Sequence, residues 1–253
     1  MYIIMDLDDT LLKKDKSLSK FTLDTLDSLK KDGHIIVFNT ARSLDATLDV
    51  IDIVKPHYSI LNGGALIVKG KEKIYEDVVS NDLVNKIIKE LLENNVEEFS
   101  IQCDEGLFSN LESYPLKNPK ATYFDYTNEF KYVASKILLC DPSGEIANRL
   151  SLKYDLKITH YVNGPWYRLS TCNKQDGNVA LFKLLKDNSP KSICFGDDIG
   201  DLEMLKEATV GVALSNSVEK VLNEIKIVTK YSSDEDGVAI FLDEYFKKNK
   251  TSI

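Results

Sequence analysis

Short apolar segments alternate with amphipathic segments of helical period at both ends of the 253-residue chain. Near-continuous apolar strands joined by helices are typical of a parallel sheet that is covered on both faces. The expected strands are residues 2–5, 35–38, 58–61, 192–195, 209–212 and 226–228, and the expected helices are 19–31, a segment from about 44, 176–186, 202–208, 218–225 and 238–246. This pattern predicts an α/β fold, with a Rossmann-like parallel sheet core and helices on both faces.

The middle of the chain has a different order of elements. The expected elements are a helix at 82–93, a hairpin of 99–103 with 106–109, an irregular stretch at 114–130, a strand at 134–140, a helix at 143–154, and a hairpin of 157–162 with 167–171 that turns at 163–165. Two successive helix-and-hairpin units predict a separate α+β domain at 80–168, inserted into a core made of 1–79 and 169–253.

The composition favours a folded protein in a reducing compartment. With 43% hydrophobic residues and a formal net charge of −8, the chain is typical of globular proteins. Its apolar runs are far shorter than the ~20 residues that span a bilayer, so we expect no membrane span. Aspartates interrupt the apolar run that a signal peptide needs, and the four cysteines lack a metal-ligand or disulfide pattern. We therefore expect a cytoplasmic protein. An acidic chain without a basic run is a poor match for nucleic acid.

Three aspartates follow the first predicted strand, in the sequence Asp6-Leu7-Asp8-Asp9-Thr10. Residues i and i+2 of an extended segment point the same way, so Asp6 and Asp8 share a face. In open α/β sheets the ligand crevice lies beyond the carboxyl ends of the strands, where these residues fall. Taken alone, the same residues are equally typical of a turn or a helix cap.

A second acidic cluster, Gly196-Asp197-Asp198-Ile199-Gly200-Asp201, follows the predicted strand at 192–195. Its simpler interpretation is a helix N-cap at Asp198. However, two carboxylate clusters at the strand ends of one sheet repel each other unless a cation lies between them. Carboxylate oxygens suit Mg²⁺, so we expect a magnesium site here.

Two further polar residues lie beside predicted strand ends and helix starts. Thr40 offers a hydroxyl and a backbone N–H at an expected helix N-terminus, where an oxyanion is stabilised. Lys174 precedes the helix at 176–186 and can supply a point charge to a phosphate. Either residue alone is unremarkable, but their order along the chain favours a phosphate site.

The order of these pieces resembles the haloacid dehalogenase (HAD) superfamily, and specifically its Cof-type phosphatases with a large α+β cap domain. The matching residues are Asp6 to Leu11, Thr40-Ala41-Arg42, Asn62-Gly63-Gly64, Lys174 with Gly177, Gly196 to Asp201, Asn216 and Asp236-Gly237-Val238. The match runs through essentially the whole predicted core, and the combination of DxDxT with GDxxxD is specific.

The resemblance implies a mechanism. It implies that Asp6 attacks phosphorus and forms an aspartyl-phosphate, and that Asp8 acts as general acid and then as base, which requires a raised pKa. It implies phosphate binding by Thr40, Ala41 and Lys174. It also implies Mg²⁺ binding by Asp6, Asp197, Asp201 and the backbone carbonyl of Asp8.

The sequence departs from the Cof-type pattern in three places. Gly200 stands where the family usually carries Asn, which removes a hydrogen bond on the phosphate side unless Asp198 replaces it. Ala41 replaces a common Gly before Arg42, which is a small change. The stretch at 111–133 is short where relatives often carry extra α/β units, so we expect a minimal cap.

These observations predict a Mg²⁺-dependent phosphatase that hydrolyses a small phosphorylated metabolite, such as a sugar phosphate, as a monomer or weak homodimer. One alternative is a phosphotransferase or phosphomutase that uses the same aspartyl-phosphate, and another is a low-activity phosphate-binding regulatory protein, which Gly200 motivates. The predicted specificity residues are Arg42, Arg168 and Asp198. Trp166 and Tyr167, beside Arg168, are more typical of packing within their hairpin.

Overall fold

The computed structural model describes residues 1–113, 121–161 and 164–250, and the chain divides into two compact units. The first unit comprises Met1–Tyr75 and Lys174–Ile253, and the second comprises Glu76–Asn173. These limits differ by a few residues from the predicted 80 and 168. The difference arises because Val79 pairs with Ala134 and because strand β11 (Trp166–Ser170) runs on to Ser170, both within the second unit.

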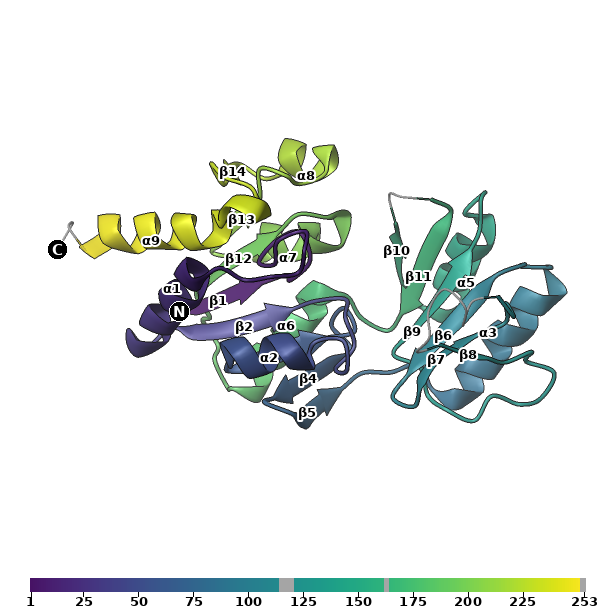
Figure 1. Cartoon of the computed structure of the whole chain (residues 1–253). Coiled ribbons are helices and arrows are strands. Elements are labelled where there is room, and N and C mark those ends of the chain that lie inside the picture. The colour runs from purple at the N-terminus through teal and green to yellow at the C-terminus, as the bar shows by residue number, and fades with distance from the viewer. Residues whose placement is uncertain (114–120, 162–163, 251–253) are drawn as a thin grey trace. The chain divides into compact units, whose positions relative to one another are not determined.

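An eight-stranded sheet forms the centre of the first unit (Figure 1). Its strands, in spatial order, are β14 (Ile227–Val228), β13 (Val210–Ala213), β12 (Ser192–Gly196), β1 (Tyr2–Met5), β2 (Ile35–Asn39), β3 (Tyr58–Leu61), β4 (Leu66–Lys69) and β5 (Glu72–Glu76). All pairings from β14 to β3 are parallel. The predicted Rossmann-like parallel core is therefore confirmed.

Strands β4 and β5 extend one edge of this sheet and were not predicted. β4 pairs antiparallel with β3, and the turn between them contains Asn62, Gly63 and Gly64 at φ 52°, 68° and 114°. This left-handed region is open to Gly and tolerated by Asn, which explains why the chain reverses here.

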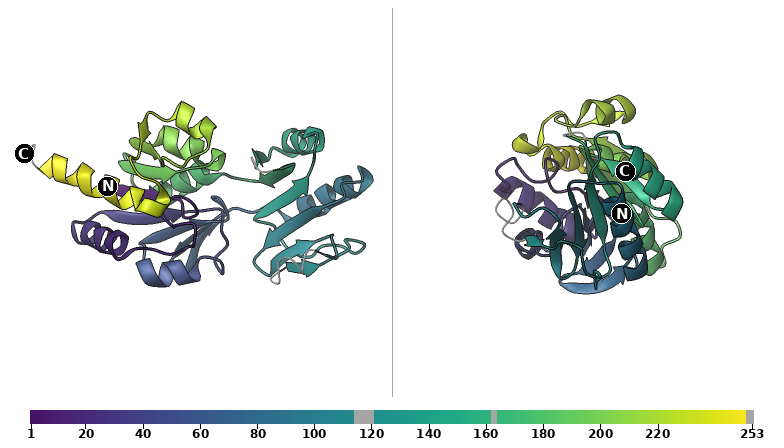
Figure 2. Two further views of the ribbon diagram at one scale, coloured as in Figure 1. Left: turned by 45° about the horizontal axis from the view of Figure 1, so that its top comes forward. Right: turned by 90° about the vertical axis from the view of Figure 1, so that its right-hand side faces the viewer.

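Helices cover both faces of the sheet because successive strand residues point to opposite sides. Ile3 and Met5 pack on the face covered by α1 (Lys20–Lys31), α2 (Leu48–Val54) and α9 (Gly237–Lys250). Tyr2 and Ile4 pack on the face covered by α6 (Lys174–Leu184), α7 (Leu202–Glu207) and α8 (Glu219–Glu224). Figure 2 shows α9 running beside α1. Helix α2 begins at Leu48 and not near residue 44, because the chain after β2 first forms a loop.

The second unit contains a six-stranded sheet with α3 (Asn81–Glu93) and α5 (Glu145–Tyr154) packed on one face. Its strands, in spatial order, are β10 (Lys157–His160), β11, β9 (Lys136–Cys140), β6 (Phe99–Cys103), β7 (Gly106–Ser109) and β8 (Ala121–Tyr123). The predicted irregular stretch at 114–130 is wrong at β8, which pairs in parallel with β7. Residues 114–120 of that stretch, and part of the predicted turn at 163–165, lie outside the described residues.

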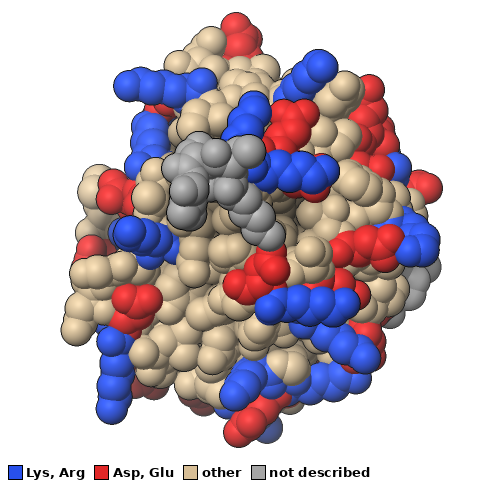
Figure 3. All heavy atoms as spheres, turned by 90° about the vertical axis from the view of Figure 1, so that its left-hand side faces the viewer, with Lys and Arg blue, Asp and Glu red and all other residues tan. Residues whose placement is uncertain are grey.

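The face that Figure 3 shows carries basic side chains, of Lys or Arg, interspersed with aspartates and glutamates. Among the described residues, no helix has both the length and the apolar character that crossing a bilayer demands.

Candidate active site

The ends of β1 and β12 bring the two predicted acidic pieces together. The parallel register pairs Met5 with Phe195, and the N–H of Asp6 donates to Phe195 O at 3.1 Å. Asp6 and Asp197 therefore follow neighbouring strands at the same edge of the sheet. Asp6, Asp197 and Asp201 each offer a carboxylate oxygen, and these oxygens lie within 4.8 Å of one another.

Lys174 contacts two of these carboxylates from the first residue of α6. Its Nζ lies 2.9 Å from Asp6 Oδ1 and 2.5 Å from Asp201 Oδ1, and all three side chains are buried. Burial acts to lower the pKa of Lys174, but the charges of Asp201 and Asp6 outweigh it and raise that pKa. Asn39 at the end of β2 holds the helix start, since its Nδ2 donates to Lys174 O and to Asn178 Oδ1, each at 2.8 Å.

Asp201 is held by the loop that carries it. Its Oδ2 accepts the backbone N–H groups of Asp197 and Asp198, both at 3.1 Å. Gly196 is needed for this approach, because a Cβ there would lie 2.4 Å from the Cβ of Asp201. Asp198 Oδ1 accepts the N–H of Ile199 at 2.7 Å, so Asp198 forms the N-cap of the short 3₁₀ helix Ile199–Asp201, as the simpler interpretation of the sequence has it.

The cluster holds three acidic side chains against one lysine, so negative charge is in excess. Burial raises the pKa of Asp6 to about 6, with the charge of Lys174 opposing the rise and that of Asp201 adding to it. Burial and the charges of Asp201 and Asp6 raise the pKa of Asp197 to about 8. A divalent cation bound by these oxygen donors would remove the repulsion, so the donor set fits such an ion.

Asp8 has different partners. Arg42 donates from Nε to Asp8 Oδ2 at 2.7 Å and from Nη2 to Oδ1 at 2.6 Å, and Lys16 Nζ lies 2.8 Å from Oδ1. Partial burial acts to raise the pKa of Asp8, but the hydrogen bonds from Arg42 and Lys16 outweigh it and hold the pKa below its ordinary value. The raised pKa expected from sequence is wrong, because two cations surround this carboxylate.

Thr40 lies buried at the end of β2. Its N–H donates to Ile60 O at 2.9 Å, and its Oγ1 accepts the N–H of Arg42 at 3.3 Å. The expectation of a backbone N–H aimed at an oxyanion is therefore wrong, because that N–H belongs to the sheet and no helix begins there. The hydroxyl remains as the group with which Thr40 can bind a phosphate. Ala41 follows Thr40 in the loop after β2.

Three site residues have contacts that sequence reasoning did not assign. Thr10 Oγ1 donates to Asp197 Oδ1 at 2.5 Å and so links the two acidic pieces. Thr10 belongs to the DxDxT motif, which is the signal that could have found it. Asn39 lacks such a signal, and Lys16 is one lysine among many in a chain with 32 basic residues.

Arg168 lies on β11 in the second unit, whereas the acidic cluster is built wholly from the first. Arg168 is buried, and its Nη2 donates to Ser170 Oγ and Cys172 O, each at 2.9 Å. Tyr167 stacks on His160 with ring centroids 4.5 Å apart, which is the packing role expected of it. Trp166 lines a hollow of about 150 Å³ together with Ser100, Leu138 and Tyr161.

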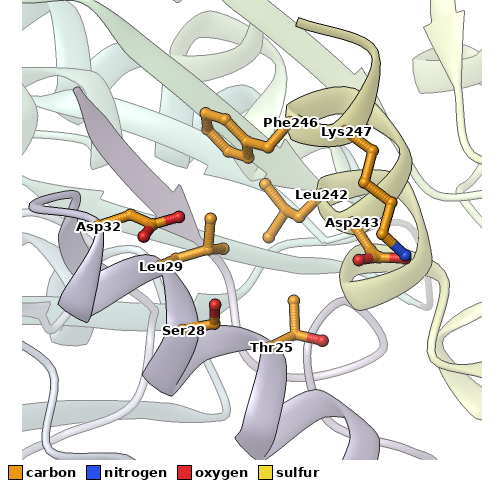
Figure 4. Close-up of a pocket in the computed structure, with 8 residues that line it drawn as sticks. All are labelled: Thr25, Ser28, Leu29, Asp32, Leu242, Asp243, Phe246 and Lys247. Carbon is orange, nitrogen blue, oxygen red and sulfur yellow. The ribbon is translucent and has the colours of Figure 1, made fainter. Parts of the chain in front are cut away.

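A second hollow, of about 180 Å³, lies between α1 and α9 (Figure 4). Its lining includes Ser28, Asp32 and Lys247. Asp32 precedes β2, so this hollow lies toward the amino end of that strand, whereas the acidic cluster lies at the carboxyl ends. None of the clustered aspartates lines it.

Comparison with known proteins agrees with the motifs. The model of the haloacid dehalogenase-like hydrolase family matches residues 3–242. The 5-amino-6-(5-phospho-D-ribitylamino)uracil phosphatase YitU of Bacillus subtilis is 27% identical over 262 residues, which cover 96% of this chain and 97% of that protein. The putative phosphatase YkrA of the same organism is 23% identical over 96% of both chains. A HAD phosphatase structure from Bacteroides thetaiotaomicron has a TM-score of 0.82 at 20% identity, covering 96% of this chain and 94% of that one. The resemblance drawn from the motifs is confirmed.

Proposed function

The chain belongs to the haloacid dehalogenase-like hydrolase family, and from this premise we propose that it is a Mg²⁺-dependent phosphatase that hydrolyses a small phosphorylated metabolite through an aspartyl-phosphate. The position of Asp6 carries the proposal. Its buried carboxylate lies 2.9 Å from Lys174 Nζ and in one cluster with Asp197 and Asp201. A nucleophile, a fixed cation and a set of metal ligands in one place supply what phosphoryl transfer requires.

In the first step, a carboxylate oxygen of Asp6 attacks phosphorus while the bond from phosphorus to the leaving oxygen breaks. Asp8 gives its proton to that oxygen, so an alcohol leaves. Arg42 and Lys16 favour the ionised form of Asp8. Asp8 must therefore take up a proton, with these contacts loosened, before the step begins.

In the second step, a water molecule attacks the phosphorus of the aspartyl-phosphate. Asp8, ionised after the first step, takes the proton of this water, and the bond between phosphorus and the Asp6 oxygen breaks to release phosphate. The contacts of Asp8 with Arg42 and Lys16 favour the ionised form that a base requires.

The other site residues bind and orient. Asp6, Asp197 and Asp201 would hold Mg²⁺, with the backbone carbonyl of Asp8 as a further proposed ligand. When bound, Mg²⁺ neutralises charge between the anionic nucleophile and the anionic phosphoryl group. Lys174, the Thr40 hydroxyl and Ala41 are the proposed contacts to the phosphoryl oxygens.

We further propose that the second unit is the cap that selects the substrate, with Arg42, Arg168 and Asp198 as specificity residues. Two relatives from Bacillus subtilis are named as phosphatases of 5-amino-6-(5-phospho-D-ribitylamino)uracil, which supports a phosphorylated sugar or sugar alcohol as the substrate class. None of the four cysteines, all of which lie among the described residues, forms a disulfide, which supports a cytoplasmic location. We expect a monomer or weak homodimer.

The test is phosphate release from a panel of sugar phosphates, the ribitylaminouracil phosphate and one aryl phosphate, with Mg²⁺ or with chelator. We expect metal-dependent turnover that Asp6→Asn lowers by a factor on the order of 10³ or more, because the nucleophile is lost. The matched control is Asp24→Asn, an exposed aspartate of α1 paired with Lys20. Full activity of Asp6→Asn, or no turnover by folded wild type, would exclude the proposal.

The same assay separates hydrolysis from phosphoryl transfer. If a second hydroxyl replaces water in the second step, the product is an isomerised or newly phosphorylated compound and little free phosphate appears. Quantifying both products for each substrate decides between the two reactions.

A further inference from the structure

Two of the sequence pieces that match the family pattern have no part in the chemistry above. They are Asn216 and the sequence Asp236-Gly237-Val238, both near the C-terminal end of the chain. In the structure, both pieces contact the segment that leads away from Asp6. This segment carries Asp8 and Thr10, so its shape affects the proposed acid/base.

Asn216 joins two parts of the backbone. Its Nδ2 donates to Asp9 O at 2.7 Å across a sequence separation of 207 residues, and its Oδ1 accepts the N–H of Ser233 at 2.8 Å. Asp9 has a φ of 54°. Non-glycine residues adopt this left-handed conformation rarely, and they keep it where several contacts hold it.

The turn at residues 232–237, which we name the C-terminal turn, contacts the same segment at Lys13 and Lys14, and it contacts helix α1 at Thr22. Asp236 Oδ1 accepts the hydroxyl of Thr22 at 3.1 Å and lies 3.5 Å from Lys13 Nζ. The N–H of Lys14 donates to Asp234 Oδ1 at 2.8 Å. Gly237 allows this turn, since a Cβ there would lie 2.2 Å from Tyr231 O.

Both chain neighbours of Asp9 have side chains that are held by hydrogen bonds. On one side, Asp8 is bound by Arg42, and on the other, Thr10 is bound to Asp197. Without the hydrogen bond to its carbonyl, Asp9 could leave its φ of 54°, and a change in this torsion turns the backbone of the preceding residue, Asp8. Proton transfer requires hydrogen-bond reach, and displacements of about 1 Å are enough to lower rates by around 10²-fold.

We propose that Asn216 is a positioning residue for Asp8: by bridging Asp9 and Ser233, it holds the left-handed turn that places the acid/base. The inference rests on the proposed function and adds a residue to it. Asn216 is exposed, so its truncation leaves the apolar core intact. Its effect is therefore expected on the proton-transfer step more than on stability.

The test compares two substrates that differ in their need for an acid. An alkyl phosphate has a basic leaving oxygen that requires a proton, whereas 4-nitrophenyl phosphate leaves as a weakly basic phenolate. We expect Asn216→Ala to lower kcat/KM by about tenfold or more for the alkyl phosphate, a part of the roughly 10²–10⁴-fold that general acid–base catalysis supplies. For the aryl phosphate we expect less than about a threefold loss, since its leaving group needs no acid.

Two variants control for the link itself. Asn216→Asp keeps the acceptor for the Ser233 N–H but loses the donor to Asp9, so it should behave like Asn216→Ala. Thr209→Val removes a hydrogen bond from the N–H of Ser192 at the other end of the strands. It should therefore lower kcat/KM equally for both substrates or for neither. If Asn216→Ala lowers kcat/KM equally for the two substrates, or lowers it for neither, the proposal is overturned.

Hydrogen exchange of residues 8–14 supplies a readout that does not depend on turnover. We expect faster exchange of these amides in Asn216→Ala and Asn216→Asp than in wild type and Thr209→Val, and unchanged exchange would overturn the proposal. Failure of the proposed function looks different, because wild type would then release no phosphate from any substrate while the exchange result would stand.

Discussion

Arg42 binds both carboxylate oxygens of Asp8, at 2.7 Å from Nε to Oδ2 and at 2.6 Å from Nη2 to Oδ1. This bidentate geometry is available to arginine and not to lysine. It places a cation directly on the proposed acid/base and lowers the pKa of Asp8 against the effect of its burial. In the proposed mechanism, a residue of the loop that follows β2 therefore controls the proton of Asp8.

Replacing Arg42 should move the pH profile in a defined direction. Without the guanidinium, the pKa of Asp8 rises, so protonated Asp8 persists to higher pH. We expect the basic limb of kcat/KM for an alkyl phosphate to shift to higher pH in Arg42→Met, and to shift less in Arg42→Lys, which keeps the charge. A pH–rate profile from pH 5 to 9 measures it, and a shift to lower pH would contradict the assignment.

Lys174 should be essential for stability as well as for turnover. Lys174→Met leaves Asp6 and Asp201 buried without their cation, and breaking a buried pair in this way costs about 3–5 kcal/mol. The control is Lys206→Met, since Lys206 pairs with Glu224 at the surface and such pairs contribute about 0–1 kcal/mol. Urea denaturation with chelator present measures both variants. Equal stabilities would show that the buried lysine is not needed to balance the cluster.

The metal-free protein should lose stability as the pH rises. The pKa values of Asp6 and Asp197 are about 6 and about 8 in the folded protein, above the ordinary value of 3.8. At a pH between the ordinary value and these raised values, the folded state therefore binds more protons than the unfolded chain. The free energy of unfolding therefore falls from about pH 4 to about pH 8. Asp197→Asn should reduce this fall and be more stable than wild type at pH 8 in chelator.

Mg²⁺ should reverse this loss in wild type. At a concentration 100 times its dissociation constant, a bound ion stabilises the folded state by about 2.7 kcal/mol. We expect this gain at pH 8 in wild type and a smaller one in Asp197→Asn, as measured by urea denaturation with and without Mg²⁺. An equal gain in both proteins would place the ion elsewhere.

Gly200 offers a test of the departure from the family pattern. A Cβ at this position meets no atom within 4 Å, so Gly200→Asn should change stability by no more than about 0.5 kcal/mol. Asp198 caps the adjacent 3₁₀ helix, and a carboxylate cannot donate in place of an amide. We therefore expect Gly200→Asn to raise kcat/KM by about tenfold, the value of one hydrogen bond to a charged group. Gly200→Ala is the control. Equal kcat/KM values for Gly200→Asn and Gly200→Ala would show that the side-chain amide of Asn contributes nothing at this position.

The parallel core and its two acidic pieces could be predicted from sequence. The apolar runs around Ile3 and Ile193 are local signals of buried strands, and parallel strands place their carboxyl ends at one edge. Asp6 and Asp197 follow such runs directly, so their proximity needed no knowledge of the loops. The helix N-cap at Asp198 was likewise an available interpretation, because capping depends on neighbouring residues alone.

The contacts between distant segments were decided only by the tertiary structure. The pairing of Asp8 with Arg42 and Lys16, the use of the Thr40 N–H by the sheet, and the link from Asn216 to Asp9 all depend on the path of loops after the strands. A periodic pattern reports which face of an element is buried, but it carries no information about which distant residue lies opposite a loop. For the same reason the motifs led us to expect Asp8 beside other carboxylates, with a raised pKa. In the folded protein Asp8 instead lies between two cations, Arg42 and Lys16, which lower its pKa.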